Sequence, residues 1–146
     1  MSDYRNILVP VDLSEESEQV CHRAMDITKK YGAKLHLLHV VEYVPVEPMG
    51  EALLPSVQIE DELVQNARNR LEDLATSLNL ESVERWIEVG NTKAEILRIA
   101  DEHNIDLIVV GCKGRHGLNI LLNLTEDTLL HAANCDVLAV RLDATD

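Results

Sequence analysis

Short apolar runs that recur along the chain place the strongest constraint on its fold. The segments Asn6–Val11 (NILVPV), Lys34–Val41 (KLHLLHVV) and Asp106–Val110 (DLIVV) are rich in Val, Ile and Leu and are bounded by polar residues. Most successive positions in them are apolar, so both faces of each strand must be covered. This pattern is typical of parallel strands that lie between two layers of helices.

Segments with helical periodicity separate these runs. Further strands are expected at 83–89 and 137–141, which gives a strict alternation of strands and helices. Parallel strands need long crossover connections, and the helices supply them. We therefore expect an α/β fold, a single-domain open parallel five-stranded sheet with helices on both faces, which is a Rossmann-like arrangement. The expected helices cover residues 14–31, 57–79, 92–104 and 126–133.

Local signals predict where these helices begin and end. Ser14, followed by two glutamates, is expected to cap the first helix, and Gly32 is expected to end it in a left-handed conformation. The sequence Thr92–Glu95 fits a capping box at the start of the third helix. Leu63 is expected on the buried side of the second helix.

Composition limits the possible partners. The chain has 146 residues and a net charge of −13, which disfavours nucleic acid and anionic membranes as partners. No apolar run reaches membrane-spanning length and no secretory leader is recognisable, so a soluble cytoplasmic protein is expected. The three cysteines are widely spaced and predict neither a disulfide framework nor a structural zinc site. His36 and His39 lie three positions apart on one strand and face opposite sides, so no metal site is expected there.

The loop that follows Val110 is the best candidate for an anion site. In open parallel sheets, ligands bind outside the carboxyl ends of the strands. Gly111 and Gly114 lack a Cβ atom, so their backbone can adopt φ > 0 and approach a ligand closely. Lys113 and Arg115 add positive charge beside the start of a predicted helix. Neither the Rossmann nor the Walker glycine pattern is present.

Four stretches of the chain together resemble the universal stress protein A family. They are ILVPVDLSEES near the start, LHLLHVVE in the second strand, DLIVVGCKGRHGL, and HAANCDVLAVR near the end. The resemblance spans residues 1–146 as one domain and implies an adenine-nucleotide α-hydrolase-like fold. It also implies a homodimer, and the interface in the family often involves the last strand, which is Val137–Arg141 here. Some members of the family bind ATP, with Mg²⁺, and others do not.

The resemblance also implies which residues line a nucleotide site. The acid after the first strand is Asp12, and the backbone group after the second strand is at Val40. Pro10, Val11 and Val110 correspond to the lining of the pocket, and Gly111 and Gly114 to the glycines near ribose and phosphate. Further contacts are implied at Arg115, Asn123 and Thr125.

The second half of the loop departs from the family pattern of G-x-x-G, a spacer and G-[ST]. With a spacer of nine residues, the glycine position would hold Leu124 and the hydroxyl position Thr125. With a spacer of eight, 115–122, which aligns the downstream segment without a gap, the glycine position holds Asn123 and the hydroxyl position holds Leu124, which Thr125 follows. Asn tolerates the left-handed region, but Leu124 offers no hydroxyl. Glu126 and Asp127 then occupy the first turn of the expected helix, where they would repel a triphosphate.

These observations leave three functional hypotheses. The first is a universal stress protein that acts as a small regulatory module with a weak ATP pocket. The second is a dimeric stress-response scaffold that has lost the phosphate-binding half of the loop. The third is a slow ATP hydrolase, which ranks last because no side chain stands out as a base to activate water. We therefore expect no catalytic residue.

Overall fold

The computed structural model describes residues 3–42, 53–112, 129 and 132–142, and these residues follow the predicted alternation. Leu129 and Ala132 are helical, but the rest of the helix expected at 126–133 lies outside the described residues or, at Ala133, is not helical. The elements are β1 (Asn6–Pro10), α1 (Ser17–Tyr31), β2 (Lys34–Val41), α2 (Leu53–Ser77), β3 (Glu84–Val89), α3 (Thr92–Glu102), β4 (Leu107–Cys112) and β5 (Asp136–Arg141).

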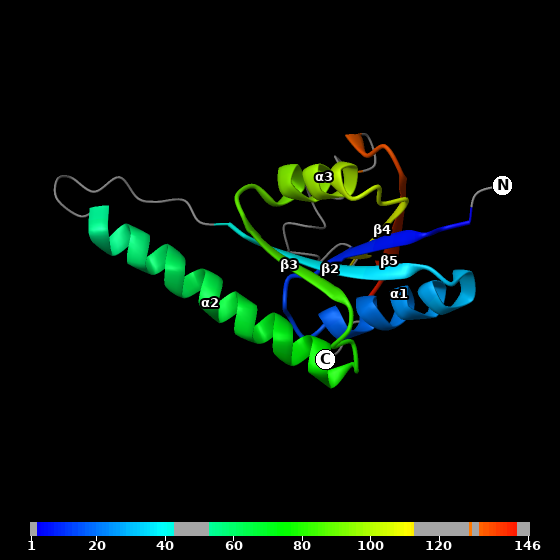
Figure 1. Cartoon of the computed structure of the whole chain (residues 1–146), viewed down its shortest axis with the longest axis horizontal. Helices are drawn as coiled ribbons and strands as arrows, with labels where there is room; N and C mark the ends of the chain where they lie inside the picture. Colours follow the sequence, from blue (N-terminus) through cyan, green and yellow to red (C-terminus); the bar gives the residue numbers. More distant parts are fainter. Residues whose placement is uncertain (1–2, 43–52, 113–128, 130–131, 143–146) are drawn as a thin grey trace.

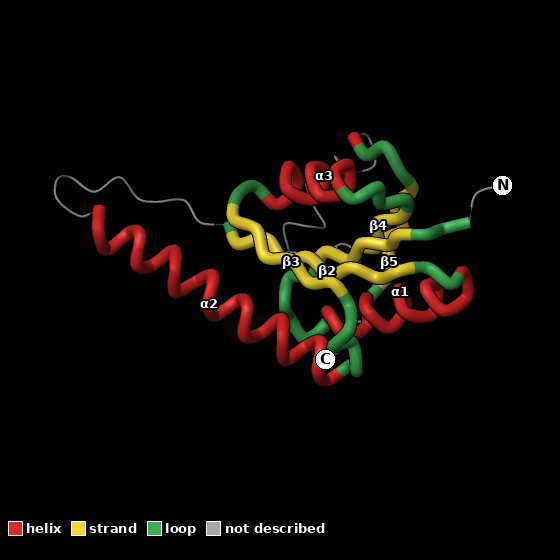
Figure 2. The backbone as a smooth tube through the Cα atoms, in the orientation of Figure 1, coloured by secondary structure: helices red, strands yellow, loops and turns green. Residues whose placement is uncertain are grey.

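The strands form one five-stranded sheet in the order β3-β2-β1-β4-β5, and every neighbouring pair is parallel. Helices α1 and α2 cover one face, and α3 covers the other (Figure 1; Figure 2). The predicted fold class is therefore confirmed. The order also shows that the chain builds outwards from β1 to β3 and then returns to the other side of β1.

Two apolar clusters hold the layers together, one on each face of the sheet. Alternation along β1 divides its side chains between them: Ile7 and Val9 pack towards α1 and α2, whereas Leu8 packs towards α3. Leu71 and Ala75 of α2 pack in the first cluster. On the other face, the buried residues of α3 are Ile96, Ile99 and Ala100. Burial of both faces explains the continuous apolar runs in the sequence.

The N-caps of two helices differ from the sequence prediction. Helix α1 begins at Ser17 and its N-cap is Glu16, without a side-chain cap hydrogen bond, so the prediction for Ser14 was wrong. Helix α3 begins at Thr92 as expected, but Asn91 is the cap, and its side-chain oxygen accepts a hydrogen bond from the Ala94 N–H at 2.9 Å. At the end of α1, Gly32 has φ 67°, which confirms the predicted left-handed residue.

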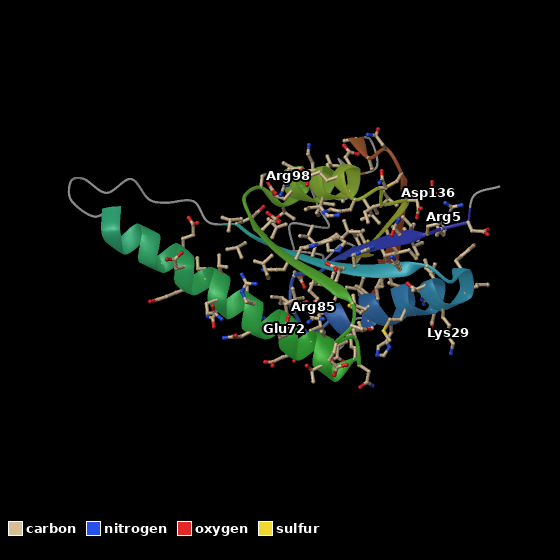
Figure 3. The ribbon with its side chains drawn as sticks, viewed as in Figure 1. Arg5, Lys29, Glu72, Arg85, Arg98 and Asp136 are labelled. Atoms are coloured by element: carbon tan, nitrogen blue, oxygen red, sulfur yellow. The ribbon has the colours of Figure 1, made fainter. Side chains whose placement is uncertain are left out.

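Helix α2 is longer than predicted and begins four residues earlier, at Leu53. In Figure 1 its amino-terminal part extends past the described part of the sheet. Leu63 is accordingly 39% exposed, so its predicted place on the buried side was wrong. The carboxyl-terminal half stays on the sheet, where Glu72 pairs with Arg85 of β3 at 2.7 Å (Figure 3).

Candidate functional site

The strand order creates a switch point between β1 and β4. From β1 the chain moves to β2 and β3 on one side, and it later fills β4 and β5 on the other. The connections that leave neighbouring strands at such a point diverge to opposite faces and open a crevice at the carboxyl ends. The ends concerned are Pro10 in β1 and Gly111 in β4, two of the residues that the family resemblance implied.

A small pocket lies at this switch point. Four of the predicted residues line it together, and the start of α1 and Leu142 complete the wall. The enclosed space is about 20 Å³, which is enough for a water molecule but not for a nucleotide base. The lining residues are Pro10, Val11, Asp12, Ser14, Glu16, Ser17, Val20, Gly111 and Leu142.

Asp12 organises the turn from β1 into α1. Its Oδ1 atom accepts hydrogen bonds from the Ser14 N–H at 3.0 Å, the Ser14 hydroxyl at 2.7 Å and the Ser17 hydroxyl at 3.1 Å. Partial burial raises the pKa of Asp12, but these hydrogen bonds together outweigh burial and hold the pKa below its usual value of 3.8. Asp12 is therefore an anion at neutral pH, placed at the wall of the pocket.

The residue after Asp12 has a strained backbone. Leu13 has φ 64°, in the left-handed region that leucine rarely adopts. Such a conformation costs roughly 1–3 kcal/mol and persists only where its surroundings enforce it. Here Arg70 of α2 donates a hydrogen bond from Nη2 to the Leu13 carbonyl at 2.5 Å, and the Leu13 side chain is buried in the core. The left-handed backbone of Leu13 turns the chain beside Asp12.

The hydrogen-bonded ladder between β1 and β2 ends just below the switch point. Its register ends at Pro10 opposite Leu38, and one further bond runs from the Val11 N–H to the Leu38 carbonyl at 2.8 Å. Parallel strands alternate the direction of their backbone groups, so Val40, two residues after Leu38, also directs its N–H and C=O towards β1. No residue of β1 stands opposite Val40. Its backbone groups therefore face the switch point, where the resemblance implied an adenosine contact.

His39 is a residue of this site that the sequence reasoning did not select. Its Nδ1 lies 2.7 Å from the carbonyl oxygen of Val11, the residue that follows β1. The expectation that His36 and His39 face opposite sides is confirmed, because His36 contacts Asn6 and Trp86 instead. The available signal was position, since His39 precedes Val40 at the carboxyl end of a predicted central strand.

The packing around Gly111 leaves no room for a side chain. It still belongs to β4, opposite Val140, and it does not use the left-handed backbone that glycine allows. A Cβ atom at this position would lie 2.8 Å from Val20 Cγ2 and 3.0 Å from Leu142 Cδ1. Glycine is required because helix α1 and the segment after β5 pack closely against β4.

The remaining predicted residues are not brought to the pocket of the described residues. The side chains of Val40 and Val110 are buried in the cluster beneath α3. Gly114, Arg115, Asn123 and Thr125 lie outside the described residues, as do Leu124, Glu126 and Asp127.

In the described parts of the chain, no group of three His, Cys, Asp or Glu side chains is arranged to hold a metal ion. No helix among the same residues is long and apolar enough to cross a membrane.

Comparison with known proteins agrees with this geometry. The Universal stress protein family model matches residues 3–141. Universal stress protein A homolog 2 of Coxiella burnetii is 36% identical over 143 residues, which cover 97% of this chain and 98% of the relative. Among solved structures, universal stress protein UspA from Lactobacillus plantarum superposes with a TM-score of 0.80 at 26% identity, covering 97% of this chain and all of that one.

A second solved structure is informative because of its ligand. It is a universal stress protein in complex with cAMP, with a TM-score of 0.61 and 25% identity, covering 95% of this chain and 98% of that chain. The family model and the relative from Coxiella burnetii both match almost the whole chain. The chain belongs to the universal stress protein family.

Proposed function

We propose that this protein is a cytoplasmic regulatory module that binds an adenine nucleotide at the switch point and does not act as a turnover enzyme. The observation that carries the proposal is the open backbone of Val40. A donor and an acceptor from one extended residue lie beyond the end of β1, where none of the described strands pairs with them. Buried or partly buried backbone groups of this kind are normally paired, so a ligand that pairs them is favoured.

Adenine has the complementary edge. Its ring nitrogen N1 accepts a hydrogen bond and its neighbouring amino group donates one, which matches an N–H and a C=O side by side. Because the enclosed pocket holds only a water molecule, the base is placed across the strand ends and not inside the pocket. Asp12, an anion with acceptor oxygens, is suited to ribose hydroxyls. The related structure in complex with cAMP supports this ligand class.

The phosphate groups meet a less favourable environment. Asp12 and Glu16 both line the pocket, and none of its described lining residues is basic. The compensating charges proposed from the sequence, at Lys113 and Arg115, belong to the loop outside the described residues. ATP, with Mg²⁺, is therefore proposed to bind weakly, and adenosine recognition is the better supported part of the site.

Titration calorimetry with Mg-ATP, cAMP and adenosine, each at millimolar concentrations, tests the proposal. We expect all three to release or absorb measurable heat and to raise the melting temperature. Asp12→Ala should weaken all three if Asp12 contacts ribose. No heat and no thermal shift with any of the three would refute nucleotide binding.

The second candidate function is a dimeric scaffold without a nucleotide. It is favoured by Leu124, Glu126 and Asp127 in the sequence and by the exposed edge of the sheet at β5, where Leu138 is 36% exposed. An open edge strand is a template for pairing with a second copy. Stoichiometric ATP in the supernatant of denatured, natively purified protein would exclude a scaffold that has lost nucleotide binding.

A further inference from the structure

The contact between His39 and Val11 lies where the β1–β2 ladder would otherwise make one more bond. In a regular parallel ladder, the bond from the Val11 N–H to the Leu38 carbonyl is followed by a bond from the Val40 N–H to the Val11 carbonyl. That next bond is not made, because the paired register ends at Pro10 and Leu38. The Val11 carbonyl is instead 2.7 Å from Nδ1 of His39.

The imidazole therefore replaces the backbone partner of the Val11 carbonyl. A carbonyl oxygen only accepts hydrogen bonds, so Nδ1 of His39 must carry the proton and donate. This satisfies Val11 at the point where β1 turns away into the Asp12 turn. As a consequence, β1 can end without its last carbonyl being left unpaired, and the Val40 N–H stays directed at the crevice.

We propose that His39 is a positioning residue of the nucleotide site: by pairing with the Val11 carbonyl it ends the ladder one bond early and keeps the Val40 N–H open for the base. This inference rests on the proposed function and adds the device that prepares the site. Without the imidazole, the Val11 carbonyl and the Val40 N–H satisfy each other. The sheet then extends by one bond, and the base loses its donor.

Two variants test the proposal in the full-length protein. His39→Val removes the donor and suits a strand, whereas His39→Asn keeps an N–H near the position of Nδ1. Amide hydrogen exchange of Val40, measured by NMR without ligand, reports the ladder directly, with the Leu38 amide as reference. In the wild type we expect Val40 to exchange at least 10-fold faster than Leu38. In His39→Val it should slow towards Leu38, and in His39→Asn it should stay fast.

Binding measurements on the same three proteins complete the test. The loss of one hydrogen bond to the base should weaken cAMP binding by about 10-fold in His39→Val, with His39→Asn close to the wild type. The proposal is overturned if the Val40 amide is already as protected as Leu38 in the wild type. It is also overturned if His39→Val binds cAMP as tightly as the wild type, a result that leaves the proposed function intact. A wild type that binds no adenine nucleotide overturns the proposed function, and this inference with it.

Discussion

Acidification should destabilise the fold through His36, a buried imidazole on the α3 face of the sheet. The side chain of His36 is stacked on Trp86, with ring centroids 5.1 Å apart and an interplanar angle of 5°. Trp86 is stacked in turn on His103 at 4.2 Å. The Nε2 atom of His36 lies 3.3 Å from the Oδ1 acceptor of Asn6 and therefore carries the proton. The Nδ1 atom is buried and has no hydrogen-bond partner among the described residues.

Protonation of His36 would place a second N–H on Nδ1, where no acceptor is available. Burial is the main influence on the pKa of His36 and lowers it below the usual 6.5; Glu84 opposes this, and His103 and Lys34 lower the pKa further. The folded state thus favours the neutral ring, while the unfolded chain takes up a proton near pH 6.5. Stability must then fall as the pH drops from 6.5 towards the lower folded pKa.

One buried unpaired donor costs about 1–3 kcal/mol, but proton linkage allows a loss of at most roughly 1.4 kcal/mol per pH unit below 6.5, so the loss at pH 5 should be about 1–2 kcal/mol. For a chain of this size, 1 kcal/mol shifts the melting temperature by roughly 2–4 °C. The melting temperature should therefore fall by about 2–8 °C between pH 8 and pH 5, in addition to any change from other groups. Asp12 does not overlap this window, because its pKa lies below 3.8 and its contribution is lost only at lower pH.

Urea unfolding at a series of pH values, followed by the fluorescence of Trp86, the single tryptophan, measures this effect. His36→Gln keeps an N–H that can reach Asn6 and cannot titrate, so its stability should change less than that of the wild type between pH 8 and pH 5, by about 1–2 kcal/mol. His103→Gln removes the exposed histidine of the same stack and should keep most of the wild-type slope. Identical slopes for the wild type and His36→Gln would refute the reasoning.

Three further predictions concern the site and the sheet edge. Asp12→Ala should lower the free energy of unfolding by about 1–3 kcal/mol in urea, because three donors lose their acceptor, whereas Asp12→Asn keeps an acceptor oxygen and should lose less than half as much. Gly111→Ala should cost about 1–3 kcal/mol because its Cβ meets Val20 and Leu142, and calorimetry should show a smaller cost in a Val20→Ala background; an equal cost would exclude this clash. Leu138→Lys should shift the protein to a monomer in light scattering if β5 forms the dimer, and an unchanged mass would place the interface elsewhere.

The fold was predictable because its signals are local and redundant. Apolar strands, a left-handed Gly32 and a helix beginning at Thr92 each follow from the physical chemistry of a few neighbouring residues. One error in a helix cap arose where two neighbouring residues are both suitable as the N-cap. Both Asn91 and Thr92 can cap a helix, and tertiary contacts decide between them, since the Thr92 N–H donates at 2.9 Å to the carboxylate of Glu42, which follows β2. The prediction that Leu63 is buried was wrong because helical periodicity does not show that α2 extends past the edge of the sheet.

The position of the site was predictable from the sequence, but the contacts of its residues were not. The resemblance named Asp12 and Gly111, and the strand order brings both to one crevice. The reason for glycine at 111 is a contact with Val20, ninety-one residues earlier in the sequence, which no local pattern encodes. The same is true of His39, because its partner is a backbone carbonyl in another strand. Sequence reasoning assigns roles to side chains, whereas this site depends largely on which backbone groups remain unpaired.

The charges around the crevice determine how much of a nucleotide it can hold. A phosphate about 4 Å from the Asp12 carboxylate would lose roughly 4 kcal/mol at an effective dielectric of 20, which is about three orders of magnitude in affinity. The base and the ribose carry no charge, so the Asp12 carboxylate does not repel them. The repulsion of cAMP, with one phosphate charge, is weaker than that of ATP. Salt separates the two possible outcomes for ATP. If repulsion by the acidic wall dominates, screening by 1 M salt must tighten ATP binding; if Lys113 and Arg115 of the loop dominate, the same salt must weaken it, while adenosine binding changes little in either case.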